Sequence, residues 1–74
     1  MYGFCIGDRV RSSEEKSVGK VIGFHRSETL EYILVEFDSK KAYFHDGHDD
    51  ELNKRKGKQN HCYYCTIKEL KKIN

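Results

Sequence analysis

Histidine and cysteine, side chains that readily bind zinc, gather in one stretch of the chain, Phe44–Cys65. The motif HDGH carries His45 and His48, and the motif CYYC carries Cys62 and Cys65. Two such pairs supply the nitrogen and sulfur ligands of a tetrahedral zinc site. However, CYYC has the composition of a strand, in which residues three apart point to opposite faces. We therefore expect no cofactor and keep a zinc-stabilised module as an alternative.

The same residues include a nucleophile and a base. In a catalytic interpretation Cys62 attacks as a thiolate, with His45 or His48 as its base. The adjacent His61 is unsuitable, because neighbouring residues of a strand face opposite ways. The sequence contains neither a nucleophile elbow nor a loop resembling an oxyanion hole. We expect a protein without catalytic residues.

A strong turn dipeptide, Asp46-Gly47, separates the first two histidines. Aspartate tolerates left-handed backbone geometry and glycine favours it, so a tight turn is expected here. Long ordered loops also need internal partners for their polar groups. We expect hydrogen bonds that hold this loop, donated by His45, His48 or His61 to the carboxylate of Asp46 or Asp49.

Acidic and basic clusters follow one another in this stretch. The acidic cluster comprises Asp46, Asp49, Asp50 and Glu51, and the basic one comprises Lys54, Arg55, Lys56 and Lys58. Cations beside Tyr63 and Tyr64 suit single-stranded nucleic acid, since cations contact phosphates and aromatic faces stack on bases. The alternative is a solvated loop in which the two clusters offset each other. The tyrosines are also adjacent in a predicted strand, so one of them should face the core.

Composition restricts the class of protein. The chain has 74 residues, enough for a single domain (1–74) with a small core. Its net charge is only +2 although 35% of its residues are charged, which argues against a histone-like polycation. Three cysteines cannot all pair within one chain. With no apolar run long enough to span a membrane, we expect a cytoplasmic protein with reduced thiols and no membrane partner.

Short β-strands are predicted for most of the remaining chain. Polar and apolar residues alternate at 7–11, 18–25 is rich in β-branched residues and glycine, and 30–37 alternates again. In the last of these, Ile33, Val35 and Phe37 should face inward. Thr66 and Glu69 predict one helical turn with a capping box near the C-terminus. The result is an all-β fold of four or five strands, closed into a barrel because a small sheet otherwise leaves its edges exposed, with a long loop at 45–60.

Several segments together resemble a known fold. GDRVR, GKVIGF and LVEFD, with a helical turn before the last strand, look like the SH3-like barrel of Tudor-type and KOW-type modules. More specifically, LVEFD followed by HDG, a basic spacer with glycine and HCYY resembles a group of small uncharacterised bacteriophage and prophage proteins. Their pattern has glycine at the position of Phe44, tryptophan at Tyr63 and an aliphatic residue at Cys65. The resemblance implies a setting, an infected bacterial cell, and no particular activity.

These observations favour a non-enzymatic, phage-type binding protein that attaches to a host or phage macromolecule through the loop and strand at 44–64. Inhibition of a bacterial defence system, such as an anti-CRISPR activity, is one concrete form. The expected partner is a protein or a ribonucleoprotein, with nucleic-acid binding through the basic loop as the alternative and a homodimer contact as a further expectation. The predicted contact residues are Phe44, His45, Asp46, His48, Asp49, Asp50, Lys54, Arg55, Lys56, Lys58, His61, Tyr63 and Tyr64.

Overall fold

The computed structural model describes residues 3–46, 48–49, 54–55 and 60–73. These residues form short β-strands and one turn of 3-10 helix, as the sequence predicts. The elements are β1 (Arg9–Ser12), β2 (Ser17–Arg26), β3 (Glu31–Phe37), β4 (His48–Asp49), β5 (Lys54–Arg55), β6 (Cys62–Thr66), η1 (Ile67–Glu69) and β7 (Leu70–Lys72).

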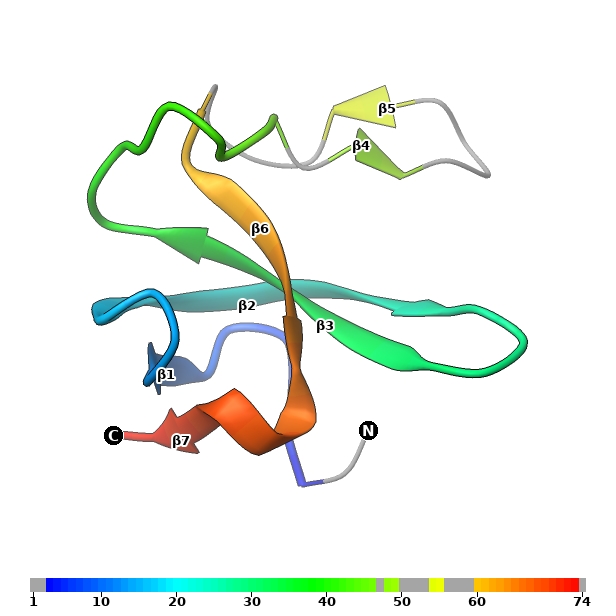
Figure 1. The fold of residues 1–74 in the computed structure, drawn as a ribbon. Coiled ribbons are helices and arrows are strands. Elements are labelled where there is room, and N and C mark those ends of the chain that lie inside the picture. The colour runs from blue at the N-terminus through cyan, green and yellow to red at the C-terminus, as the bar shows by residue number, and fades with distance from the viewer. Residues whose placement is uncertain (1–2, 47, 50–53, 56–59, 74) are drawn as a thin grey trace.

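Five of the strands form one antiparallel sheet in the order β6-β3-β2-β1-β7. A bulge between Val21 and Gly23 interrupts the register of β2, the longest strand, and such bulges bend a strand and increase its twist. β6 pairs with β3 along five residues, Tyr32 to Glu36, and Figure 1 shows the coil of η1 after β6, leading into β7 beside β1. The two outer strands of the sheet, β6 and β7, are therefore joined directly by η1, so the sheet curls into a small barrel-like fold.

Strand alternation places the core on one face of this sheet. Ile33, Val35 and Phe37 are fully or almost fully buried, which confirms the inward set predicted for β3. Val10 and Val21 face them from β1 and β2. The whole cluster comprises Phe4, Val10, Val21, Ile33, Val35, Phe37, Phe44, Cys65 and Leu70, with Phe24, Tyr63 and Ile67 packed against it.

The segment predicted as a long loop begins and ends at neighbouring positions. His45 and Cys62 exchange two backbone hydrogen bonds of 2.7 and 2.9 Å. Beside them, the Asn60 amide donates to Oδ1 of Asp46 over 3.0 Å. Between these points β4 and β5 pair as a two-stranded sheet, seen at the top of Figure 1. The five-stranded sheet therefore holds both ends of this segment.

The turn η1 is fastened to β1 through one carboxylate. Glu69 Oε1 accepts a hydrogen bond of 2.8 Å from the Thr66 amide, the capping interaction that the sequence predicts. Its other oxygen, Oε2, accepts a 2.5 Å bond from the hydroxyl of Ser12, a residue with no exposed surface. The Ser13 amide also donates to the Glu69 carbonyl at 2.9 Å. Glu69 therefore fixes how β7 meets β1.

Replacing Glu69 by alanine is expected to lower the free energy of unfolding by about 1 to 3 kcal/mol, because the buried Ser12 hydroxyl loses its acceptor. The variant S12A should cost less, and the double variant should cost less than the sum of the two. Urea unfolding of the four proteins, followed by circular dichroism, measures this coupling. Strict additivity would show that the two side chains do not interact.

Candidate functional site

Four aromatic rings share the sheet face opposite the core. We call His25 of β2, Tyr32 of β3, Tyr64 of β6 and the loop residue His45 the ring layer. Ring centroids are 5.3 Å apart for His25 and Tyr64, 6.5 Å for Tyr32 and Tyr64, and 4.9 Å for His45 and Tyr64. All four side chains are partly exposed. Tyr64 contacts each of the other three, so it is the centre of the layer.

Two apolar residues, Leu34 and Cys62, are buried within this outer face. Leu34 belongs to the face predicted to point away from the core, yet only 3% of it is exposed. It lies in register between Gly23 and Tyr64. Cys62, in register with Glu36, has no exposed surface. Near β6 the sheet therefore has buried side chains on its outer face as well as on its core face.

Cations occupy the same outer face on the other half of the sheet. The register pairs Arg11 with Lys71 of β7, and Arg9 with Lys20 of β2. Arg9 binds both carboxylate oxygens of Asp38, at 2.6 and 3.1 Å, and these bonds raise the pKa of its guanidinium. Each strand alternates, so Val10 turns into the core while its two arginine neighbours turn out. The alternation at 7–11 predicted the strand, but the sequence did not predict these cations as contact residues.

The structure corrects part of the predicted contact surface. Phe44 is a core residue, 3% exposed, and stacks on Phe37 with centroids 5.0 Å apart, so it cannot contact a partner. Tyr63 packs against the core, whereas Tyr64 faces outward, which confirms that the two tyrosines divide between the faces. Nδ1 of His61 lies 2.8 Å from the Phe37 carbonyl.

Of the predicted contact residues, His45 and Tyr64 are thus brought together in the ring layer. Asp46 is partly buried and its carboxylate is used at the base of the loop. The structure gives backbone pairing alone for His48, Asp49, Lys54 and Arg55. The predictions for Asp50, Lys56 and Lys58 lie outside the described residues.

The two cysteines of the CYYC motif do not meet. The strand β6 is continuous, with Cys62 in register with Glu36 and Cys65 with Ile33, so their side chains lie on opposite faces. Burial in the core raises the pKa of the Cys65 thiol well above its usual value, which disfavours the thiolate that zinc binds. Among the described residues no group of three His, Cys, Asp or Glu side chains could hold a metal ion. The geometry of Cys62 and Cys65 therefore does not fit the zinc tetrad that the sequence left open as an alternative.

The catalytic interpretation, in which Cys62 is the nucleophile and His45 or His48 its base, is met only in part. His45 and Cys62 are direct cross-strand neighbours, and their side chains therefore lie on the same face. Cys62, however, has no exposed surface, and a thiol nucleophile must be reached by its substrate. This arrangement supports a packing role for Cys62.

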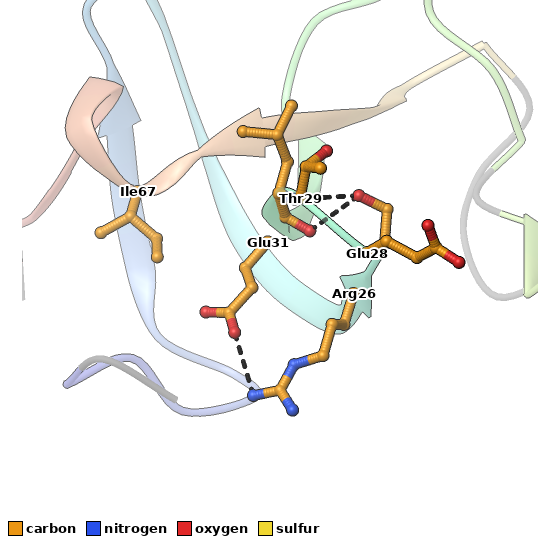
Figure 2. A pocket seen from close by; sticks show the side chains of 7 residues that line it. Arg26, Glu28, Thr29, Glu31 and Ile67 are labelled. Carbon is orange, nitrogen blue, oxygen red and sulfur yellow. Dashed lines mark hydrogen bonds and ion pairs between the residues drawn. The ribbon is translucent and has the colours of Figure 1, made fainter.

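A groove of about 590 Å³ lies elsewhere, at the β2–β3 turn. Figure 2 shows its wall, where Arg26 and Glu31 form an ion pair with a nitrogen–oxygen distance of 2.9 Å. The Ser27 hydroxyl and Leu30 exchange hydrogen bonds of 3.0 Å across the turn, and Ile67 of η1 forms the apolar side. The lining carries one cation, Arg26, and two acids, Glu28 and Glu31, and Arg26 is already paired with Glu31.

Comparisons with known proteins add no relative. The chain matches no protein-family model, no curated protein and no solved structure. No helix in the described part of the chain has the length and apolar character needed to cross a bilayer.

Proposed function

We propose that the protein is a non-enzymatic module that binds single-stranded nucleic acid on the outer face of its sheet. The observation that carries the proposal is the ring layer, whose partly exposed aromatic rings come from β2, β3 and β6 and from the loop residue His45. Arg11, Lys20 and Lys71 lie on the same face in the other half of the sheet, and no ion pair among the described residues involves them. Aromatic side chains on a sheet stack on the bases of a strand of any nucleotide sequence, and nearby cations attract its phosphates.

The orientation of the rings supports a role in stacking on nucleic-acid bases. His25 and Tyr32 are nearly parallel, with an interplanar angle of 28°, while Tyr64 is tilted against His25 by 48°. Leu34 and Cys62, which lie among the rings on this face, are buried. Replacing the aromatic partner of one stacked base by alanine costs about 1 to 3 kcal/mol of binding free energy.

The setting in the proposal comes from the sequence resemblance to phage proteins. Cys5, Cys62 and Cys65 are all thiols, which fits the reducing cytoplasm of a bacterial host. A host or phage ribonucleoprotein would present single-stranded RNA to the ring layer, and anti-defence activity would then follow from occupying that RNA. Direct attachment to a protein partner, or self-association, is the alternative that the binding experiment separates.

The experiment measures fluorescence polarisation of labelled DNA and RNA strands of about twelve nucleotides, and of the matching duplex, at about 50 mM salt. Wild-type protein should prefer the single strands. Changing Tyr64 or Tyr32 to alanine should weaken binding about tenfold or more, because a stacking partner is lost. Y43A is the matched control, since Tyr43 is 57% exposed but lies outside the ring layer.

Two results would contradict the proposal. Absence of binding to every strand at low salt would remove nucleic acid as a ligand. Equal losses in Y64A and Y43A would remove the ring layer as the site. In the first case, capture of a protein partner by wild type and not by Y64A would establish the protein-binding alternative, and sedimentation of purified protein would identify a homodimer.

A further inference from the structure

We propose that the phosphates of the same nucleic-acid strand lie along a cation band formed by Arg11, Lys16, Lys20 and Lys71, so that the strand crosses the sheet from β6 towards β7. This inference rests on the proposed function, because it assigns the backbone of the strand whose bases stack on the ring layer. It adds four contact residues and a direction of crossing.

The register of β1 opposes like charges. Arg11 lies directly across from Lys71, and Arg9 lies directly across from Lys20. Like charges at facing positions of an antiparallel pair destabilise the sheet. Folding alone therefore does not favour these residues, whereas an anion bound between them would relieve the repulsion.

The charges of the band are available to a ligand. No ion pair among the described residues involves Arg11, Lys16, Lys20 or Lys71, and all four side chains are exposed. Arg9 differs, because Asp38 already binds its guanidinium. Lys20 faces Glu36 on its other side, which partly offsets its charge. Arg11 and Lys71 should consequently contribute most to binding.

A groove beside Arg11 gives a phosphate room to approach. It has a volume of about 300 Å³ and lies at the turn between β1 and β2, where Arg11 and Lys16 line it together with serines. The turn carries two acids, and neither lines the groove. Glu14 is exposed, and the carboxylate of Glu15 accepts a hydrogen bond from Tyr43 and lies 3.8 Å from Nζ of Lys41. The groove therefore keeps its positive character.

One cross-strand row connects the band with the ring layer. Lys20 pairs with Glu36, Glu36 with Cys62, and Cys62 with His45. From β6 to β7 the sheet spans four interstrand spacings, roughly 19 Å. At about 3.4 Å per stacked nucleotide, a strand of roughly six nucleotides reaches both the rings and the cations.

The test compares two double variants that remove the same charge. R11Q/K71Q removes the facing pair of the band, and K40Q/K68Q removes two exposed lysines from outside it. For a single strand of about twelve nucleotides, each lost phosphate contact lowers the slope of log affinity against log salt by about 0.7. Between about 50 and 200 mM salt, the wild-type loss of affinity should therefore shrink about sevenfold in R11Q/K71Q. The control variant should keep the wild-type slope.

Thermal unfolding at low salt supplies an independent readout. R11Q/K71Q should unfold at the wild-type temperature or above it, because the facing charges repel each other. A lower unfolding temperature would indicate that these side chains have a structural role and would count against the band.

The outcomes separate the two proposals. Wild-type affinity and slope in R11Q/K71Q, with binding weakened in Y64A, would overturn the cation band and leave base stacking in place. Loss in R11Q/K71Q with none in Y64A would overturn base stacking and leave a phosphate site on the band. Absence of binding by wild-type protein would overturn both.

Discussion

Replacing Gly19 by alanine is expected to destabilise the protein by about 3 kcal/mol or more, a large part of the roughly 4 to 11 kcal/mol expected for a chain of 74 residues. An added Cβ at Gly19 would lie 2.7 Å from the Phe37 Cα and would overlap the Glu36 carbonyl oxygen. Both are backbone atoms of β3, and a backbone cannot turn aside as a flexible side chain can. Strands β2 and β3 would have to separate where Gly19 faces Phe37, at the end of β3.

Gly7 provides the matched control for this prediction. It has a φ of +96°, but a Cβ there would meet nothing within 4 Å. G7A should therefore cost only the strain of left-handed backbone, about 1 to 2 kcal/mol. Urea unfolding monitored by circular dichroism compares the two variants with wild type. A midpoint for G19A that equals wild type, or falls less than that of G7A, would contradict the close approach of β2 and β3.

Local patterns were sufficient to predict β1, β2, β3 and β6, whereas β4 and β5 lie in the segment predicted as a long loop. In β3 each inward residue of Ile33, Val35 and Phe37 alternates with an outward one, and that period is visible without any partner. Thr66 and Glu69 likewise predicted η1, because a capping box is a local interaction. The burial of Leu34 was missed because it depends on Tyr64, which lies far along the chain on β6.

The predicted contact surface was less accurate, because which side chains of a strand point inward depends on the strand with which it pairs. The sequence established that Tyr63 and Tyr64 must divide between the two faces, but which one faces inward is decided by the pairing of Tyr63 with Val35. Phe44 ends a short apolar run, Ala42-Tyr43-Phe44, before a polar loop, a position equally typical of a contact residue and of an anchor. Its burial follows from Phe37, which closes β3 beneath it.

The ring layer and the cation band both combine distant parts of the chain. His25 and Tyr32 become neighbours of Tyr64 only because β6 adds to β3 and not to β5. Arg11 and Lys71 come from near the two ends of the described chain and meet through the pairing of β1 with β7. Clusters of residues close in sequence, such as the basic run 54–58, are visible in the sequence alone. Residues that only strand pairing brings together, such as Arg11 and Lys71, are not.

Changing Phe44 to alanine is the second prediction with a large effect, a loss of about 3 to 5 kcal/mol of unfolding free energy. The ring stacks on Phe37 and also lies 5.6 Å from the Tyr63 ring and 5.1 Å from the Tyr43 ring, measured between centroids. Removing it leaves a cavity where the connection after β3 joins the core. His45 follows directly, so its pairing with Cys62 should loosen as well.

Y43A distinguishes this anchoring from a general effect of the loop. Tyr43 is exposed over 57% of its surface, and its hydroxyl donates to Glu15, an interaction that raises the pKa of the phenol to about 12. Y43A removes that hydrogen bond and the edge contacts of the ring with Phe44 and Tyr63, but it empties no buried space, so it should destabilise the protein less than F44A does. F44L, which keeps much of the apolar volume, should lie between the two. If F44A unfolds at the same urea concentration as Y43A, the segment 38–46 is not anchored through Phe44, and the position of His45 in the ring layer needs another cause.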